Sequence, residues 1–252
     1  MTQPIIRFEG VSKAFGTQTV LRDFSLDVEP GAFVSIIGRS GCGKTTVLKL
    51  VNGLLSPDTG RVLIQGQDVA RIDPVALRRR IGYAIQNVGL FPHMTVEKNI
   101  AYVPAISGLE EWKGKQSREK VAALLKQVGL DPALAGRYPR ALSGGQRQRV
   151  GIARALAAGP ELLLMDEPFG AVDEITRGQL QDELLRIHRE SGITVLFVTH
   201  DIAEALKLGT RTLVMDAGQI QQYDAPSRLL AHPATSFVER LVRRSRVFQT
   251  RA

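Results

Sequence analysis

Gly38-Arg39-Ser40-Gly41-Cys42-Gly43-Lys44-Thr45 decides the fold of this 252-residue chain. The apolar, β-branched run at 33–37 before it is typical of a buried parallel strand, and 45–51 after it has helical spacing up to Asn52-Gly53. The motif G-x-x-x-x-G-K-T thus stands between a strand and a helix, the context in which backbone N–H groups surround phosphate oxygens. The sequence predicts an α/β fold with a phosphate-binding loop.

Residues of this loop have distinct expected roles. Lys44 should reach the β- and γ-phosphates of a nucleoside triphosphate, and the Thr45 hydroxyl should ligate Mg²⁺. Cys42 is the single cysteine, and no resolving thiol is near in sequence, so we expect a small filler rather than a redox group. The residues expected to bind the nucleotide here are Gly38, Arg39, Ser40, Gly41, Cys42, Gly43, Lys44, Thr45 and Thr46.

Two adjacent carboxylates follow a second predicted buried strand at 161–165, whose last four residues are apolar. An acid at the end of a parallel strand beside a phosphate loop can hold the Mg²⁺ shell, so we assign Asp166 to the metal. Glu167 is expected to point the other way along the pleat, toward an attacking water, and to act as general base. The alternative is that both acids merely begin the next segment, but an acidic pair after an apolar run is a poor turn signal.

Two further polar residues follow strand-like runs and are assigned to catalysis. His200 comes after 194–199, at the carboxyl end of a predicted parallel strand, where ligands of open α/β sheets collect. A lone histidine is more often structural or exposed, but this placement favours a hydrogen bond to the γ-phosphate or the water. Gln86 follows 81–85, and its amide could touch both the water and Mg²⁺, so we also assign it to the metal.

Leu142-Ser143-Gly144-Gly145-Gln146 forms a second helix start that contains glycine. Ser143 is a good N-cap for the helical pattern of 147–158, and the glycines allow an anion to approach the backbone. Capping alone explains Ser143 but not two glycines at positions where each lowers helix stability. We therefore expect Ser143, Gly144, Gly145 and Gln146 to contact the triphosphate from a second side.

The order of these motifs resembles the ATP-binding cassette (ABC) ATPases. The stretch 142–146 matches the family signature, Asp173 matches its D-loop aspartate, and His200 its switch histidine. The resemblance covers nearly the whole chain. It implies a P-loop NTPase core with an antiparallel β subdomain and a helical subdomain, and ATP and Mg²⁺ as cofactors. It also implies a head-to-tail homodimer that holds ATP between the loop of one cassette and the signature, with Asp173, of the other.

The resemblance also assigns Phe15, before Gly16, to the aromatic residue that stacks on adenine, although Phe15 could equally be an ordinary strand residue. Phenylalanine replaces the commoner tyrosine but still offers a ring face. Gly170 and Val172 depart from the commoner Ser-Ala-Leu-Asp pattern before Asp173, and we expect no loss of activity from this difference.

We expect one cassette domain over 1–252. Its predicted parts are the core with the antiparallel β subdomain at about 1–86 and 160–240, the helical subdomain at about 87–159, and a basic C-terminal tail at 241–252. The local patterns predict antiparallel strands at 5–11, 20–28 and 61–65, a helix at 119–128, a hairpin of 211–215 and 219–222, and a last helix at about 234–243.

Composition limits the function classes. The formal charge of +8 could serve nucleic acid, an anionic membrane surface or triphosphate binding. Much of it is local, at Arg78-Arg79-Arg80 and at Arg240, Arg243, Arg244 and Arg246, so a solvated basic face is the simplest interpretation. The sequence contains no long uncharged apolar stretch, so we expect no membrane span. The single cysteine and an N-terminus without a signal-peptide pattern fit a reducing cytosol.

Within the ABC ATPases, two classes fit poorly. DNA-repair members carry a long coiled coil, but residues 86–141 lack sustained heptads, and translation-type factors carry two cassettes. The remaining class is the ATPase subunit of a membrane transporter. It implies a peripheral position on the cytoplasmic face of the membrane, transmembrane permease subunits as partners, indirectly a solute-binding protein, and no nucleic acid.

Residues 87–96 and 169–206 look like the ATPases of osmoprotectant importers, which take up glycine betaine, choline, carnitine or proline betaine. The stretch 86–104 corresponds to where that family receives the coupling helices of its membrane subunits, so His93 is expected to be an interface or packing residue. The chain ends soon after Val242 without regulatory domains, so sensing of ionic strength is not expected. Import of another polar solute, such as an amino acid or a polyamine, stays open, as does a nucleic-acid-linked ABC ATPase.

Overall fold

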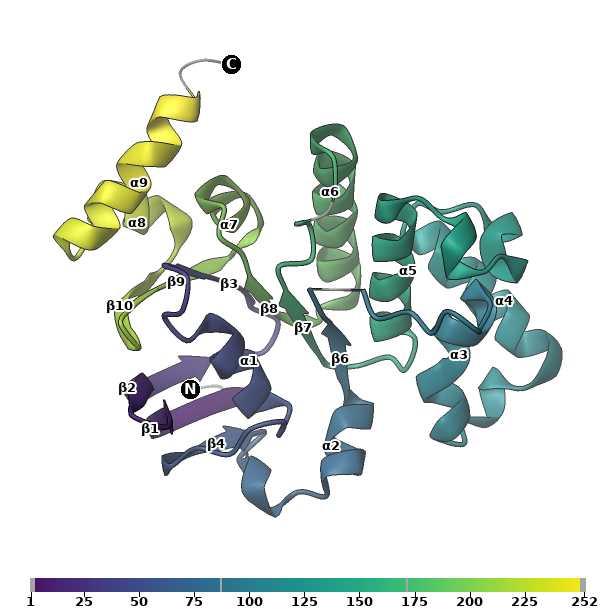
Figure 1. The fold of residues 1–252 in the computed structure, drawn as a ribbon, viewed down its shortest axis with the longest axis horizontal. Coiled ribbons are helices and arrows are strands. Elements are labelled where there is room, and N and C mark those ends of the chain that lie inside the picture. The colour runs from purple at the N-terminus through teal and green to yellow at the C-terminus, as the bar shows by residue number, and fades with distance from the viewer. Residues whose placement is uncertain (1–2, 87, 171, 250–252) are drawn as a thin grey trace. The chain divides into compact units, whose positions relative to one another are not determined.

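The computed structural model describes residues 3–86, 88–170 and 172–249, the last six by their backbone alone. The chain forms two compact units, which are described separately (Figure 1). The first unit comprises Met1–Leu77 and Thr194–Ala252, and the second comprises Arg78–Ile193. Asn87 and Ala171, which belong to motifs quoted above, lie outside the described residues.

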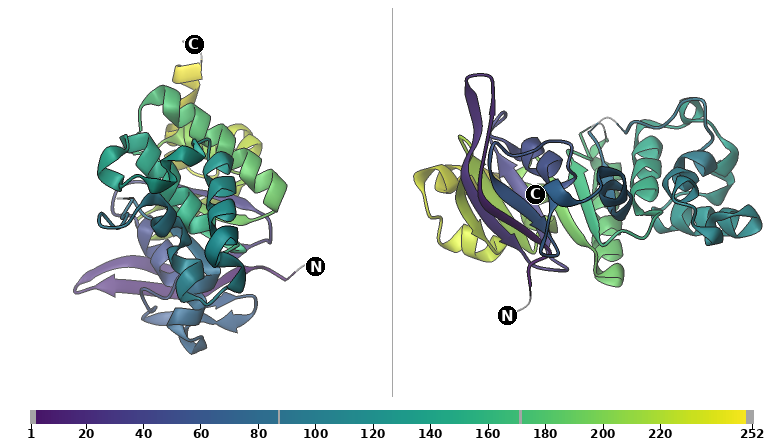
Figure 2. Two further views of the ribbon diagram at one scale, coloured as in Figure 1. Left: turned by 90° about the vertical axis from the view of Figure 1, so that its right-hand side faces the viewer. Right: turned by 90° about the horizontal axis from the view of Figure 1, so that it is seen from below.

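An antiparallel sheet opens the first unit. Its strands stand in the order β2-β1-β4-β5 and comprise β1 (Ile6–Phe15), β2 (Gln18–Val28), β4 (Thr59–Ile64) and β5 (Gln67–Asp68). The β1–β2 hairpin projects from this sheet, as both views of Figure 2 show. Phe8 and Phe24 meet edge to face across the two strands, with ring centroids 5.1 Å apart, and this contact helps to fix the hairpin register.

A second sheet of this unit carries the phosphate loop. Its strands follow the order β10-β9-β3-β8 and comprise β3 (Phe33–Gly38), β8 (Thr194–Val198), β9 (Arg211–Asp216) and β10 (Gln219–Asp224). β3 runs parallel to both β8 and β9, and its first five residues are buried. That burial explains the continuous apolar run, because both faces of a parallel strand are covered.

Most helices of the first unit follow strands of this second sheet, whereas η1 follows β5 of the antiparallel sheet. They are α1 (Lys44–Val51), η1 (Val69–Arg71), α7 (Ile202–Leu208), α8 (Pro226–Ala231) and α9 (Ser236–Gln249), and α2 (Pro74–Arg80) begins in the unit. Val238 and Val242 of α9 share one apolar cluster with Ile37 at the end of β3 and Ala205 of α7. The C-terminal helix therefore packs behind the strand that leads into the phosphate loop.

The second unit combines two parallel strands with helices. The strands are β6 (Ile81–Ala84) and β7 (Leu162–Asp166). The helices are α3 (Val96–Ile106), η2 (Glu110–Trp112), α4 (Gly114–Gln127), η3 (Pro132–Gly136), η4 (Pro139–Ala141), α5 (Gly144–Leu156) and α6 (Glu174–Ser191). α3, α4 and α5 pack on one another, and their buried residues include Ile100, Val121 and Val150.

Some element boundaries differ from the sequence predictions, because polar residues at the ends of helices and strands show no hydrophobic periodicity. The helix predicted at 119–128 starts at Gly114, since its first turn is polar. β1 continues to Phe15 through residues that are only partly buried or exposed. The last helix extends to Gln249, so residues 241–249 of the predicted tail are helical. The predicted subdomain boundaries stay predictions.

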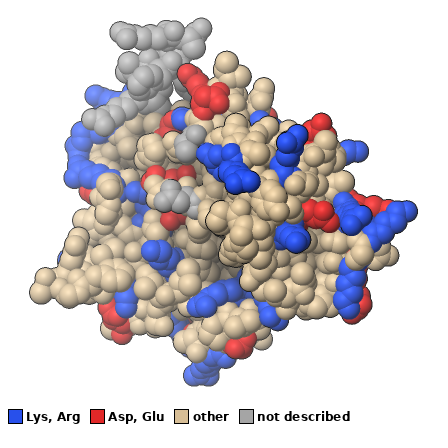
Figure 3. Space-filling view, turned by 45° about the vertical axis from the view of Figure 1, so that its right-hand side comes forward, with Lys and Arg blue, Asp and Glu red and all other residues tan. Residues whose placement is uncertain are grey.

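None of the described helices is long and apolar enough to span a bilayer. Basic side chains are spread over the face shown in Figure 3, with acidic side chains among them. Arg78, Arg79 and Arg80 are exposed, and Arg243 pairs with Glu239 at 2.7 Å. The side chains of Arg244 and Arg246 lie outside the described part of the chain.

Candidate nucleotide-binding and catalytic site

The phosphate loop has a backbone shape that requires glycine. Gly41 and Gly43 have φ values of 77° and 104°, which L side chains rarely adopt. A Cβ at Gly43 would also lie 2.8 Å from Leu21 Cδ2, whereas one at Gly41 would meet nothing within 4 Å. Gly43 is the N-cap of α1 and supplies no side-chain cap. The first-turn N–H groups therefore lack a capping side chain, as an anion-binding helix start requires.

Lys44 is held by the loop that it is expected to serve. Its Nζ donates to the carbonyl oxygens of Gly38 at 3.0 Å and Arg39 at 2.9 Å, and the residue is only 8% exposed. The loop backbone that would surround the phosphate oxygens thus also fixes the position of the ammonium group. Cys42 is also buried, and burial raises the pKa of its thiol, so it stays neutral and fills space beneath Gly38.

Arg39 connects the same loop to two other elements of the first unit. Its guanidinium lies 5.1 Å from the ring centroid of Phe237, on α9, and its Nε lies 3.8 Å from Asp216 Oδ1, at the end of β9. The arginine side chain is 66% exposed, so each contact is weak. They nevertheless support the residue whose carbonyl holds Lys44.

His200 lies exposed directly after β8, between the strand and α7. A buried hydrogen bond fixes the backbone next to it, because Thr199 Oγ1 donates to Glu204 Oε2 at 2.6 Å and accepts from Asp201 N at 3.0 Å. Asp201 in turn caps α7 by accepting from Ala203 N. The exposed histidine therefore stands between two residues, Thr199 and Asp201, that hydrogen bonds hold in place.

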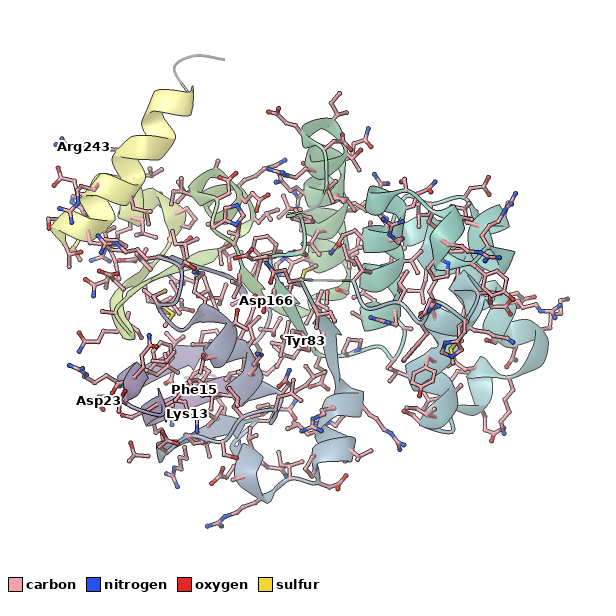
Figure 4. The ribbon with its side chains drawn as sticks, viewed as in Figure 1. Lys13, Phe15, Asp23, Tyr83, Asp166 and Arg243 are labelled. Atoms are coloured by element: carbon pink, nitrogen blue, oxygen red, sulfur yellow. The ribbon has the colours of Figure 1, made fainter. Side chains whose placement is uncertain are left out.

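Phe15 ends β1 at the tip of the hairpin, and the residue is 49% exposed (Figure 4). Lys13 Nζ lies 5.8 Å from the ring centroid and is itself bound to Asp58 Oδ1 at 2.6 Å. A half-exposed ring beside a fixed ammonium group is able to stack on a flat heterocycle, as predicted for adenine.

Asp166 is the last residue of β7 and is only 6% exposed. Tyr83 lies on the neighbouring strand β6 (Figure 4). Burial, and then the negative charge of Asp166, raise the pKa of Tyr83 to about 12. The phenol hence stays neutral and adds no second negative charge beside the predicted metal ligand.

Glu167 turns away from β7 for a reason that the sequence analysis did not anticipate. The strand ends at Asp166, and Glu167 has φ of 46°, an uncommon backbone conformation for a residue other than glycine. This turn, rather than the pleat, directs the side chain. Gln86 Nε2 donates to Glu167 Oε2 at 3.0 Å, so two of the predicted catalytic residues meet within the second unit.

The second helix start caps itself. Ser143 Oγ accepts from Gln146 N at 3.2 Å, and Gln146 Oε1 accepts from Ser143 N at 2.9 Å, which completes a capping box. A Cβ at Gly145 would lie 3.0 Å from Thr176 Cγ2 of α6, so helix packing accounts for one of the two glycines. Gly144 and Gly145 keep their N–H groups outside the box.

Asp173 is the N-cap of α6, where its Oδ1 accepts from Thr176 N at 3.0 Å. The hydrogen bond with the Thr176 backbone holds the pKa of this exposed carboxyl below its usual range. Capping thus explains Asp173 within one chain, and its contact with a nucleotide stays a prediction.

The predicted metal ligands Thr45, Gln86 and Asp166 carry oxygen donors of the kind that Mg²⁺ prefers. Among the described residues, no group of three or more His, Cys, Asp or Glu side chains could hold a metal ion. Magnesium prefers one or two protein oxygens together with phosphate oxygens and water. Thr45, Gln86 and Asp166 supply such oxygens, one hydroxyl, one amide and one buried carboxylate.

The predicted residues thus fall into two groups, one in each unit. Phe15, His200 and the loop 38–46 belong to the first unit, and Gln86, the signature, Asp166, Glu167 and Asp173 to the second. Sequence analysis missed Phe237 beside Arg39, and also Asn99 and Arg154, whose side chains bind the backbone of the segment after Gln86. One signal was available, because Arg154 interrupts an otherwise apolar and small-residue run at 150–157.

A strand–loop–helix of this geometry, with a carboxylate pair after a buried strand, defines a P-loop nucleotide-binding cassette. The ABC transporter family matches residues 21–170, and the chain belongs to that family. A dimeric structure of the ATP-binding cassette MJ0796, in a post-hydrolysis state bound to ADP and Pi, superposes with a TM-score of 0.80. It is 33% identical and covers 88% of this chain and 98% of its own. The predicted fold class is confirmed.

Several relatives are close over the whole chain. The glycine betaine/carnitine/choline transport ATP-binding protein OpuCA of Bacillus subtilis is 46% identical over 98% of this chain. The glycine betaine uptake system ATP-binding protein YehX of Escherichia coli is 47% identical over 96% of this chain and 77% of its own length. A sulfate/thiosulfate import ATP-binding protein, CysA of Thermosynechococcus vestitus, is 45% identical over 97% of this chain and 72% of its own length. The chain spans 64% of the length of OpuCA.

Proposed function

We propose that this protein is the ATP-hydrolysing subunit of an importer for quaternary-amine osmoprotectants such as glycine betaine or choline. The observation that carries the ATPase assignment is a phosphate loop with an uncapped helix start and a backbone-held Lys44. Its second support is the contact between Gln86 and Glu167. The osmoprotectant assignment rests on the likeness to OpuCA and YehX.

Each residue has a role that its surroundings support. The first turn of α1 and Lys44 bind the phosphates, and Phe15 stacks on the adenine. Glu167 accepts a proton from the attacking water, with Gln86 orienting both the carboxylate and the water. His200, fixed by the Thr199–Glu204 hydrogen bond, donates to the γ-phosphate. Bound Mg²⁺ would neutralise phosphate charge, and Thr45, Asp166 and Gln86 would hold it.

Two copies of the chain complete the site in this proposal. Ser143, Gly144 and Gly145 of one cassette face the phosphate loop of the other, and Asp173 lies in the same interface. The dimeric structure of MJ0796 with ADP and Pi supports this arrangement. ATP drives closure only to the extent that it binds the closed pair more tightly than the open one.

The partners follow from the transporter assignment. We place the dimer on the cytoplasmic face of the membrane, bound to transmembrane permease subunits, with a solute-binding protein acting through them. Nucleic acid is not a partner in this proposal. The names of the relatives support import, because each is described as a transport, uptake or import ATP-binding protein.

The substrate has to be tested directly, because this chain is 46% identical to OpuCA and 45% identical to the sulfate/thiosulfate import protein CysA. The protein is purified with its permease subunits, reconstituted into liposomes with its solute-binding protein, and supplied with ATP. We expect uptake of labelled glycine betaine or choline and none of labelled sulfate, and uptake should stop in the Glu167→Gln variant. Uptake of sulfate, an amino acid or a polyamine alone would overturn the substrate assignment and keep the ATPase assignment.

A further inference from the structure

Arg154 is an arginine within the apolar part of the helix that begins after Ser143. Its neighbours in and directly after α5 are buried, namely Val150, Ile152, Ala153, Ala155 and Ala157, whereas Arg154 itself is half-buried. This partial burial lowers the pKa of Arg154, although a guanidinium remains protonated in proteins. A charge partly removed from water is costly unless strong hydrogen bonds compensate it, so the partners of this side chain matter.

Those partners are two main-chain carbonyls of the segment that follows Gln86. Nη1 donates to Gly89 O and Nη2 to Val88 O, both at 2.8 Å. The guanidinium carbon also lies 5.9 Å from the ring centroid of Phe91. A planar fork can serve two adjacent carbonyls at once, and hydrogen bonds from a charged donor are stronger than neutral ones.

Two further contacts fix the same segment. At Gly151, one turn before Arg154, a Cβ would lie 2.6 Å from Val88 Cγ1, so the glycine lets the segment approach the helix. Asn99 of α3 is fully buried and holds the continuation of the segment through hydrogen bonds with Phe91, Met94 and Thr95. Residues 88–95 are therefore clamped between α3 and α5.

The clamp begins two residues after Gln86. Gln86 reaches Glu167 Oε2 at 3.0 Å, and Glu167 is itself held in an uncommon backbone conformation. A hydrogen bond of this length between two exposed or half-exposed side chains depends on where their backbones lie. The hydrogen bonds of Arg154 fix the backbone shortly after Gln86, at Val88 and Gly89.

We propose that Arg154 is a positioning residue for Gln86. By binding the carbonyls of Val88 and Gly89, Arg154 fixes Gln86 against Glu167. The position of Gln86 then depends on α5, the helix that begins after Ser143. This inference rests on the proposed ATPase function and deepens it. Arg154 touches neither nucleotide nor water in this scheme, and it acts on turnover through Gln86.

The test measures steady-state ATP hydrolysis by Arg154→Ala, Gln86→Ala and the double variant, each assayed well below its melting temperature. We expect Arg154→Ala to lower kcat about 10- to 100-fold, the range for a misplaced catalytic group, with KM for ATP changed less than about threefold. The double variant should be no slower than Gln86→Ala alone, because residues that act as one unit are not additive. Multiplication of the two effects would overturn the proposal.

Arg149 provides a matched control on the same helix. Its Nη1 donates to Gly129 O at 3.0 Å and its Nη2 to Gln179 Oε1 at 3.2 Å, away from the segment after Gln86. Arg149→Ala should lower the melting temperature yet leave kcat within about twofold. A loss of kcat as large as that of Arg154→Ala would show that any loosening of α5 suffices, and would remove the special role of Arg154.

Gly151→Ala tests the clamp without changing the charge. The new methyl group must displace Val88, and the helix propensity of alanine, about 1 kcal/mol above that of glycine, offsets part of the strain. Assayed well below the melting temperature of the variant, kcat should be lower than that of wild type, and an unchanged kcat would contradict the proposal. If the wild-type protein itself hydrolysed no ATP, the proposed function would fail; an active wild type with normal Arg154→Ala turnover sinks only this inference.

Discussion

The two helix starts that carry the predicted phosphate contacts are built differently. α1 begins at Gly43, in the left-handed conformation, with no capping side chain, whereas α5 begins at Ser143 with a complete capping box. The N-cap of the first supplies no side chain, and the loop holds Lys44 beside it. The second satisfies the N–H groups of Ser143 and Gln146 by itself. The start of α1 is therefore better suited than the start of α5 to hold an anion by itself.

The second start offers less to an anion. What remains outside the capping box is the hydroxyl hydrogen of Ser143 and the N–H groups of Gly144 and Gly145. Such a surface contributes most to anion binding when another group already holds the anion. In our proposal, that group is the phosphate loop of a second copy of the chain. Four substitutions test this division, taken in order of decreasing expected effect.

Glu167→Gln should lower kcat by about 10²–10⁴-fold, because the amide cannot accept the proton of the attacking water. ATP binding should persist. Because this variant hydrolyses ATP slowly, ATP stays bound long enough to measure the contribution of each helix start. Steady-state hydrolysis and nucleotide binding are the measurements. Glu161→Gln, at the exposed beginning of the same apolar run, is the control and should behave like wild type. A near-normal rate for Glu167→Gln would exclude the general-base role.

Ser143→Arg should abolish ATP-dependent dimerisation in the Glu167→Gln background. The bulky cation both removes the cap and fills the space that an anion would use, while the lone cassette should bind ATP within about twofold of its usual affinity. Analytical ultracentrifugation with and without ATP makes the measurement. Ser143→Thr keeps a capping hydroxyl and should still dimerise. Dimers of the arginine variant would refute the two-sided contact.

Lys44→Ala should weaken ATP binding by about 10- to 100-fold, the equivalent of losing one hydrogen bond to a charged group. Binding of a fluorescent ATP analogue to the lone cassette reports it. Lys49→Ala, in the last turn of the same helix, is the matched control and should change affinity little. Unchanged affinity of the Lys44 variant would place the triphosphate elsewhere.

Phe237→Leu should weaken ATP binding by about two- to fivefold. Leucine keeps the apolar packing of α9 but removes the ring beside Arg39, and exposed cation–π contacts contribute about 0.5–1 kcal/mol. The same binding assay measures the effect, and Phe237→Tyr, which retains a ring, should match wild type. No difference between leucine and tyrosine would show that the phosphate loop does not depend on α9.

Much of this site could be predicted from the sequence, for a local reason. The loop 38–46 needs glycine at set backbone conformations, and Ser143 with Gln146 three residues on is a capping box in sequence as well as in space. Asp166 ends a strand that its apolar run predicted. Each of these features depends on residues within about ten positions of one another.

Other features could not be predicted. Arg154 and the carbonyl of Val88 are 66 positions apart, and Gln86 and Glu167 are 81 apart. No local pattern reports which distant segments will touch. The direction of Glu167 was predicted from the strand pleat, whereas a left-handed turn after Asp166 sets it.

The family, the phosphate loop and a set of candidate site residues could therefore be predicted from the sequence, since these follow from short-range backbone geometry and side-chain type. The folded chain alone shows how Lys44 is held, which carbonyls Arg154 binds, and that Gln86 meets Glu167. The physical reason is that these contacts arise when buried helices and strands pack, and packing joins residues that the chain itself keeps far apart.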